Sequence, residues 1–198
     1  GHMKKTMEQI QKDLKLVDIG VELLDARIPM ASQNPEIKKL IKDKKRIVVL
    51  NKADLADEKE NQKWVSKFAK ENIPAILCNS STGEGVSKII PTANEIMKKD
   101  LEKAENKGRV GKIIRIMIIG VPNVGKSSII NKLAQKNSAV VGNKPGVTKQ
   151  KQWIRLSNNV ELLDTPGVLW PKLDNEKVAL NLAYTGTIKS EVLEQQEI

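Results

Sequence analysis

The chain has 198 residues, a formal net charge of +10 and one cysteine, Cys78. This length fits one domain, or one domain with a short extension. A hydrophobic fraction of 39% supports a packed core and excludes wholesale disorder. A single cysteine excludes a disulfide framework and a cysteine-rich metal site. No apolar run approaches the roughly 20 residues of a membrane span. The positive charge favours a polyanionic partner.

Short apolar runs alternate with amphipathic stretches along the chain. Strands are predicted at residues 18–25, 46–50, 75–78 and 113–119, and as a hairpin at 151–156 and 160–163. Helices are predicted at residues 4–16, 58–71 and 86–104, with a kink or an early break at Pro91. Residues 98–112 are charged and lack apolar periodicity, so we expect a linker there. The alternation predicts an α/β fold with a mostly parallel sheet and helices on both faces.

A phosphate-binding pattern follows the most apolar predicted strand. Residues 120–127 match G-x-x-x-x-G-K-[ST], and residues 128–133 continue as a helix. In such a loop, backbone N–H groups and the helix N-terminus surround phosphate oxygens. Lys126 would reach the β- and γ-phosphates, and the Ser127 hydroxyl would hold Mg²⁺. The predicted phosphate-side residues are Pro122, Asn123, Val124, Gly125, Lys126, Ser127 and Ser128.

Two later segments complete the predicted phosphate site. Asp164-Thr165-Pro166-Gly167 follows the second strand of the hairpin. There, Asp164 can hold Mg²⁺ through water and the Gly167 N–H can contact the γ-phosphate. Thr148 lies in the Gly- and Pro-rich residues 142–148 and can reach Mg²⁺ when GTP is bound. We therefore expect Lys126, Thr148 and Gly167 to contribute to catalysis, or Thr148 to lie in an ordinary surface loop.

Residues that can read a guanine base come earlier in the chain. Asn51-Lys52-Ala53-Asp54 follows the strand at 46–50. The Asp54 carboxylate can accept hydrogen bonds from guanine N1–H and the N2 amino group, and adenine offers neither donor in that place. Asn51 would tie loops together, and the Lys52 stem would cover the base. After the next strand, the turn that begins Asn79, Ser80 and Ser81 can offer N–H groups to guanine O6. The predicted ligands are GTP and GDP.

These motifs resemble the GTP-binding domain of translation-factor-type GTPases, a P-loop NTPase G domain, with the motifs in another order. The base-reading motifs come first, giving the order G4-G5-G1-G2-G3, which is a circular permutation rejoined through residues 98–112. Among permuted GTPases the chain resembles the ribosome biogenesis GTPase A family, of the YlqF/RbgA type. Besides the motifs above, the resemblance is carried by residues 1–3, Leu24-Asp25-Ala26-Arg27-Ile28-Pro29, Asn34-Pro35, Pro145-Gly146-Val147-Thr148 and residues 164–171.

The resemblance implies GTP hydrolysis during assembly of the large (50S) ribosomal subunit, with the particle and its rRNA as partners. It also implies a cytoplasmic protein without a membrane partner, which we expect to be a monomer. Residues 1–184 would form the GTP-binding domain. Residues 185–198 would begin the family's C-terminal helical segment, which is truncated here.

The residue after the Asp164–Gly167 motif bears on the rate of hydrolysis. Many GTPases have a water-orienting glutamine there, whereas this chain has Val168. We therefore expect slow hydrolysis that is stimulated by the particle. Similar GTPases use an N-terminal histidine, which makes His2 the catalytic candidate, although Gly-His-Met is also a common remnant of an expression tag. Related GTPases with an asparagine at position 123 bind K⁺ beside the phosphates, so Asn123 is a candidate K⁺ ligand, or a plain turn residue.

Other functions remain open. The basic residues within 36–46 and 98–115 can contact rRNA phosphates or can be solvated helix faces. A nucleotide-gated RNA or ribosome adaptor with incidental hydrolysis would carry the same motifs. A P-loop kinase would prefer adenine and would lack residues 51–54. A signalling GTPase at a membrane would need a lipid motif or an apolar helix.

Overall fold

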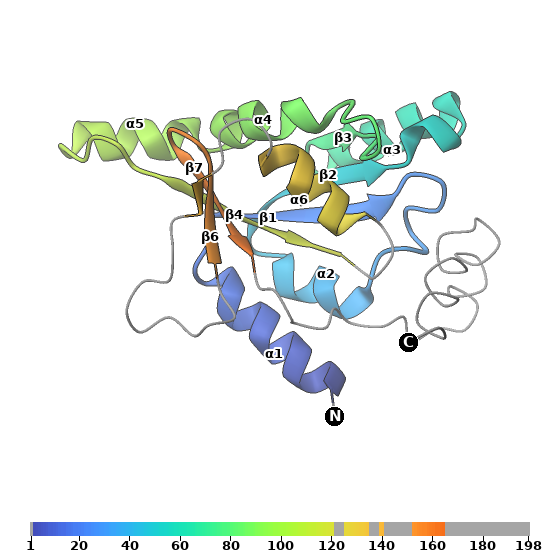
Figure 1. The fold of residues 1–198 in the computed structure, drawn as a ribbon, viewed down its shortest axis with the longest axis horizontal. Coiled ribbons are helices and arrows are strands. Elements are labelled where there is room, and N and C mark those ends of the chain that lie inside the picture. Colours follow the sequence, from blue (N-terminus) through green and yellow to red (C-terminus); the bar gives the residue numbers. More distant parts are fainter. Residues whose placement is uncertain (1, 121–124, 135–138, 141–151, 165–198) are drawn as a thin grey trace.

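The computed structural model describes residues 2–120, 125–134, 139–140 and 152–164 of the chain. Helices and strands alternate along it (Figure 1). The helices are α1 (His2–Leu14), α2 (Pro35–Ile41), α3 (Glu58–Lys70), α4 (Ile89–Ile96), α5 (Lys98–Asn106) and α6 (Lys126–Ala134). The strands are β1 (Ile19–Asp25), β2 (Lys45–Asn51), β3 (Ala75–Leu77), β4 (Ile114–Ile119), β5 (Ala139–Val140), β6 (Gln152–Ser157) and β7 (Val160–Asp164). Short 3₁₀ helices span Ala53–Leu55 and Val86–Lys88.

The strands form one seven-stranded sheet in the order β3-β2-β1-β4-β7-β6-β5. The four neighbouring pairs from β3 to β7 are parallel, and the two pairs that β6 makes are antiparallel. This confirms the predicted α/β class with a mostly parallel sheet. The centre of the sheet is the pair β1 and β4, with Ile19 opposite Ile116. The sheet therefore joins an N-terminal set of strands to a C-terminal set.

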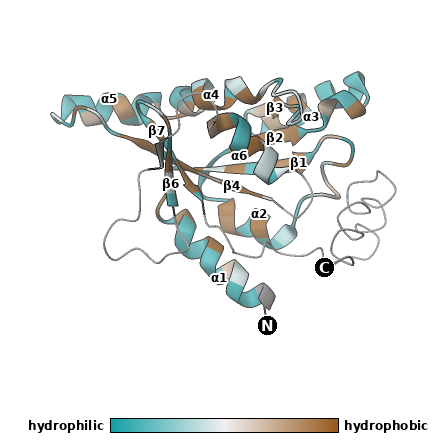
Figure 2. Cartoon of the chain, in the orientation of Figure 1, coloured by the Kyte–Doolittle hydropathy of each residue, from teal (hydrophilic) through white to brown (hydrophobic). Residues whose placement is uncertain are grey.

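Helices cover both faces of the sheet, as the alternation predicts. On one face, α4, α5 and α6 pack over the odd-numbered residues of β1, and Ile89 and Ile129 lie in the same core. On the other face, α1 and α2 pack together over β4, and Phe68 of α3 packs against Leu24 of β1. The central strands are therefore apolar on both faces, which is typical of parallel strands (Figure 2).

In the region of residues 86–112, the predicted helix is confirmed over most of its length, whereas the predicted effect of Pro91 and the predicted linker are wrong. The predicted helix at 86–104 is a 3₁₀ turn followed by α4 and α5, and the break falls at Met97. Pro91 lies in the first turn of α4, where a missing N–H breaks no bond within the helix, so it causes no kink. The predicted linker at 98–112 is helical as far as Asn106, because Leu101 and Ala104 face the core.

Helix α2 was not predicted, since it lies in a run of lysines. The Asn34 side chain caps it by accepting hydrogen bonds from the N–H groups of Glu36 and Ile37. Pro35 occupies the first helical position, which suits its fixed φ. Ile37 and Ile41 then face the core beside α1. The Asn34-Pro35 pair therefore starts a helix.

Within the described ranges, no helix is long and apolar enough to cross a membrane. The predicted domain boundary at residues 184–185 lies outside the described residues.

Candidate functional site

The predicted site residues follow strands that end at one edge of the sheet. Because β1, β2, β3, β4 and β7 run parallel, their carboxyl ends share this edge. Ligands of open α/β sheets bind outside this edge. Asp25, Asn51 and Asp164 are the last residues of β1, β2 and β7. Helix α6 also begins there, after the loop that follows β4.

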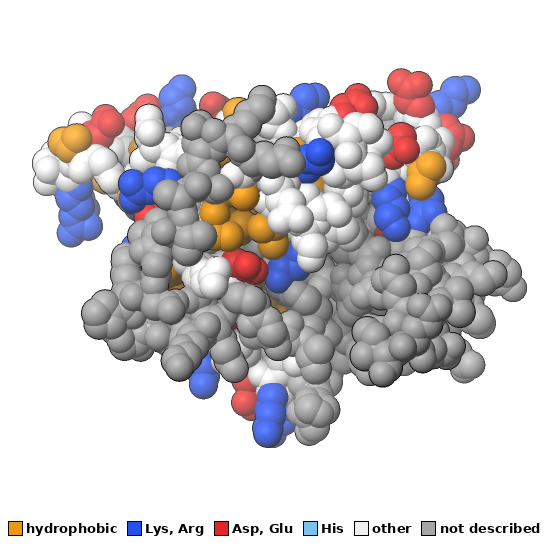
Figure 3. Space-filling view, in the orientation of Figure 1, with side chains coloured by type: hydrophobic (Ala, Val, Ile, Leu, Met, Phe, Trp, Pro, Cys, Tyr) orange, Lys and Arg blue, Asp and Glu red, His pale blue; other side chains and the backbone are white. Residues whose placement is uncertain are grey.

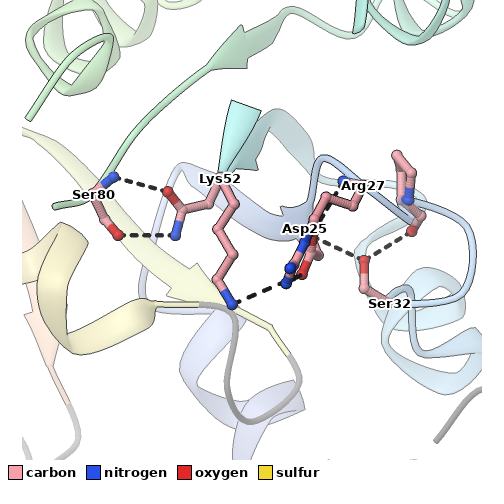
Figure 4. Close-up of polar contacts among 7 residues, drawn as sticks. Asp25, Arg27, Ser32, Lys52 and Ser80 are labelled. Atoms are coloured by element: carbon pink, nitrogen blue, oxygen red, sulfur yellow. Dashed lines mark hydrogen bonds and ion pairs between the residues drawn. The ribbon is translucent and has the colours of Figure 1, made fainter. Parts of the chain in front are cut away.

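Three loops meet at the side chain of Asn51, which is fully buried. Its Nδ2 donates to Ser80 Oγ at 3.0 Å, and its Oδ1 accepts from the Ser80 N–H at 2.9 Å (Figure 4). Gly125 packs against the same amide. It has a φ of +92°, and a Cβ on it would collide with Asn51 Nδ2. Asn51 thus joins the loop after β2 to the loop after β3, and the phosphate-loop glycine lies against it.

The loop after β3 is a tight turn with its own hydrogen bonds. The Asn79 side chain accepts from the N–H groups of Ser81 and Thr82 at 3.0 and 3.3 Å. Gly85 has a φ of +82°, and a Cβ there would collide with the Leu77 carbonyl. The Ala53 N–H donates to the Cys78 carbonyl at 3.1 Å, which links this turn to residues 51–54. Asp54 and Ser81 are exposed, so both are open to a ligand.

Lys52 lies beside a buried carboxylate to which the sequence assigned no role. Its Nζ is 3.9 Å from Asp25 Oδ2, and the Asp25 side chain is fully buried. Arg27 donates to both carboxylate oxygens, from Nε at 3.0 Å and from its terminal nitrogen at 2.8 Å. The Arg27 N–H adds a third bond, and the Asp25 N–H donates to Ser32 Oγ. Asp25 therefore holds Arg27 and Lys52 at this edge.

This arrangement gives a structural role to Asp25 and Arg27. Both belong to the segment Leu24–Pro29, which is part of the resemblance to the family but had no role assigned from the sequence. Asp25 and Lys52 are far apart in sequence, and only the β1–β2 register, with Asp25 opposite Asn51, brings them together. Lys52 also has a φ of +61°, a left-handed conformation that is uncommon for a lysine. Strained backbone of this kind is concentrated at functional sites. The strand pairing could not be read from the motif alone.

The described phosphate-loop residues lie at the start of α6. Ser127 and Ser128 are exposed in its first turn, where unpaired N–H groups attract anions. Burial of Lys126 lowers its pKa to about 8, since the charged form is poorly solvated there, and nearby Asp164 opposes this shift. A partly desolvated lysine in the first turn of a helix can stabilise phosphate charge strongly.

Several predicted residues are not placed by the structure. Pro122, Asn123, Val124, Thr148 and Gly167 lie outside the described residues. Helix α1 begins at His2, whose side chain also lies outside what is described. Among the described residues, no three or more histidine, cysteine or acidic side chains gather into a metal site. Protein ligands for Mg²⁺ are therefore limited there to isolated groups such as Ser127 and Asp164.

The strand–loop–helix at β4 and α6, with the base-side loops beside it, defines a P-loop nucleotide-binding α/β domain. A family model described as 50S ribosome-binding GTPase matches residues 115–194. Ribosome biogenesis GTPase A of Bacillus licheniformis is 47% identical over 198 residues, which cover 100% of this chain and 70% of that protein. The Thermotoga maritima protein of the same name is 38% identical, with coverage of 100% and 68%.

The fold also resembles that of a solved structure. GNP-bound YlqF from T. maritima superposes with a TM-score of 0.63 at 34% identity, covering 91% of this chain and 65% of that one. The chain belongs to the ribosome biogenesis GTPase A family.

Proposed function

We propose that this chain binds GTP and GDP at the carboxyl edge of its sheet and hydrolyses GTP as a switch in large-subunit assembly. The observation that carries this proposal is the junction of Asn51, Ser80 and Gly125 beside Lys126. It brings base-side and phosphate-side loops together at one edge of the sheet. Family membership supports the same function.

Guanine is read by Asp54, while the Lys52 stem covers the base and the turn at Asn79, Ser80 and Ser81 meets the O6 atom. The exposure of Asp54 and the pairing of Lys52 with Asp25 support these roles. Asp54→Asn should weaken GTP binding and strengthen binding of xanthosine nucleotides, because the amide presents a donor to the ring. Unchanged base preference in a competition assay would exclude this assignment.

Phosphate binding and charge neutralisation are the tasks of the phosphate loop, from Pro122 to Ser128. Lys126 and the first N–H groups of α6 bind the phosphate oxygens. The Ser127 hydroxyl and Asp164 fit Mg²⁺, which takes few protein ligands and several from water and phosphate. Thr148 would add a ligand in the GTP state. When bound, Mg²⁺ would neutralise charge that develops on the β- and γ-phosphates.

Hydrolysis is attack of water on the γ-phosphate, with the Gly167 N–H contacting that group. Val168 cannot orient water, so the rate in isolation is slow and the particle supplies the missing polar contact or its positioning. His2 is the catalytic candidate within the chain, and Asn123 is the candidate ligand for K⁺. The relatives' names support a ribosomal partner for this step.

The domain is circularly permuted, with the motif order G4-G5-G1-G2-G3. Two findings support this: the strands of the base-side motifs, β2 and β3, precede β4 in the chain, and the pair β1 and β4 unites both sets. The junction is then not a free linker, since it includes α5.

The deciding experiment measures GTP turnover in K⁺ and in Na⁺ buffer, with and without purified large ribosomal subunits. We expect slow turnover alone, strong stimulation by the subunits and faster rates in K⁺. Binding without any stimulation would instead favour the nucleotide-gated adaptor. A His2→Ala variant tests the N-terminal candidate, and it should lose stimulated turnover while keeping GDP affinity.

A further inference from the structure

The loop between α5 and β4 is the most exposed basic segment among the described residues. Residues 105–112, which are the last two residues of α5 and the loop that follows it, are exposed without interruption. Gly108 and Gly111 have φ values of +79° and +84°, and a Cβ on either would meet no atom within 4 Å. Between and beside these glycines stand Lys107, Arg109 and Lys112. Val110, at the tip, is 91% exposed, well above the other exposed large apolar residues.

The basic residues within 36–46 and those within 105–112 differ in how many hydrogen bonds and ion pairs they make within the protein. Within residues 36–46, Lys39 pairs with Glu36, Lys44 donates to the Val17 carbonyl at 2.9 Å, and Lys45 pairs with Asp100. Arg46 is largely buried and attracts the buried Glu22 carboxylate. Four of the six basic residues in this cluster are thus engaged in the fold. Lys38 and Lys42 alone are exposed without a hydrogen bond or ion pair among the described residues.

Within the part of the chain that the structure describes, Lys107, Arg109 and Lys112 make no hydrogen bond or ion pair through their side chains. Lys112 only adds, from a longer distance, to the charges that lower the pKa of Asp100, after the hydrogen bond from Lys45. Their charges are therefore available to a partner. Figure 3 shows basic and apolar side chains projecting at the end of the molecule where α5 leads into this loop.

The chemistry of this loop fits a nucleic-acid backbone better than a protein surface. Three unpaired cations lie within six residues, and two glycines let the backbone approach a phosphate closely. Protein interfaces need a buried apolar centre, whereas this loop offers Val110 alone. Cations without a pocket bind a polyanion mainly by releasing its counterions.

The loop also lies away from the nucleotide. It leads into the amino end of β4, and the phosphate loop follows the carboxyl end of the same strand. A six-residue strand is about 20 Å long. A partner can therefore bind here without contacting the nucleotide.

We propose that residues 105–112 are a contact for structured ribosomal RNA, in which Lys107, Arg109 and Lys112 bind phosphates and Val110 packs against sugar or base edges. This inference rests on the proposed function for the identity of the RNA. It assigns the contact to this loop and not to the cluster at 36–46.

The test reverses the loop's charges with Lys107→Glu, Arg109→Glu and Lys112→Glu together. The matched control changes three exposed lysines elsewhere, with Lys5→Glu, Lys59→Glu and Lys70→Glu, so the net charge changes equally. Binding to a 20-base-pair RNA duplex and to purified large subunits is measured against salt concentration. GDP affinity and thermal stability are measured in parallel, and both should stay unchanged.

We expect the loop variant to bind the duplex about 10- to 100-fold more weakly at 0.1 M salt, with a salt slope about two to three units shallower. The control should lose far less. Equal losses in both variants would overturn the proposal, because net charge would explain them. A variant that loses subunit binding but keeps the wild-type duplex slope would also overturn it, since the contact would then be with protein.

The two proposals fail in different ways. Wild-type protein that binds the duplex through this loop but never binds subunits would contradict the proposed function and support the RNA contact. If subunits stimulate GTP turnover and the loop variant binds RNA as well as the wild-type protein does, the proposed function is supported and the RNA contact is contradicted.

Discussion

The polar residues at the carboxyl ends of the parallel strands differ in burial and pairing from those at the amino ends. At the carboxyl edge, Asp25, Asn51 and Ser80 are buried and hydrogen-bonded to protein groups. At the amino edge, Lys107 and Arg109 are exposed and have no such partners among the described residues. Prearranged polar groups select a small ligand by geometry, whereas solvated charges attract any polyanion in a salt-dependent way. We therefore expect selective binding of a small ligand at the carboxyl edge and salt-dependent binding of a polyanion at the amino edge.

The largest expected effect comes from removing the charge nearest the phosphates. Lys126→Ala should reduce GTP hydrolysis by at least about 100-fold, because a partly desolvated cation at developing charge has no substitute in water. Lys112→Ala removes the same charge at the other edge and should leave hydrolysis unchanged. Single-turnover assays on both variants measure the contrast. Similar losses of GTP hydrolysis in the two variants would mean that the two edges of the sheet do not differ in their role in hydrolysis.

Two glycines with left-handed backbone give the next contrast. Gly125→Ala forces a methyl group into Asn51, so we expect about a 30-fold loss of GDP affinity from some 2 kcal/mol of strain and displacement. Gly111→Ala has a similar φ but open space around it. It should lower stability by about 1 kcal/mol and leave GDP affinity intact. Calorimetry and urea denaturation separate the two, and an equal loss of affinity in Gly111→Ala would contradict the comparison.

Asp25 provides a test of the paired network itself. Asp25→Asn removes the carboxylate that Arg27 and Lys52 contact, so the free energy of unfolding should fall by about 1–3 kcal/mol. GDP affinity should fall about tenfold, because Lys52 is no longer held at the base. Asp100→Asn breaks the exposed pair with Lys45 and should cost under about 1 kcal/mol, with no change in GDP affinity. Full GDP affinity in Asp25→Asn would show that Lys52 does not depend on this carboxylate.

The smallest effect is a pH dependence set by Lys126. Burial lowers its pKa from 10.5 to about 8, so above pH 8 the free protein holds it mostly neutral, while bound phosphate favours the charged form. GTP binding should therefore take up a proton at pH 8.5, and affinity should fall a few-fold per pH unit. Since the unfolded chain keeps the ordinary pKa, this group makes the free protein more stable as pH rises from about 8 to 10.5.

Titration calorimetry in two buffers of different ionisation enthalpy measures this uptake. Lys126→Arg, whose guanidinium stays charged, should show none. Equal heats in both buffers for the wild-type protein would contradict the lowered pKa.

The sequence predicted the central strands because runs such as Ile114–Ile119 are apolar enough to need burial on both faces. It missed α2 because five lysines within 36–45 conceal Ile37 and Ile41. It also took α5 for a linker, since only Leu101 and Ala104 mark its inner face. At the site, motif spacing placed Asn51 and Ser80 in adjacent loops. The partners of Asp25 depend on strand register and side-chain direction, which no local pattern contains.

The central pairing of β1 with β4 has a consequence for how the chain folds. The Arg115 N–H donates to Asp18 across 97 residues, beside a register that begins with Ile19 opposite Ile116. During synthesis, β1 to β3 leave the ribosome well before β4 and α6, so β1 has one open flank until then. Contacts this distant in sequence are slow to form and leave apolar edges exposed meanwhile. Because the phosphate loop follows β4, nucleotide cannot stabilise β1 to β3 before β4 is made. It acts instead on the later steps, in which β4 and β7 join the sheet.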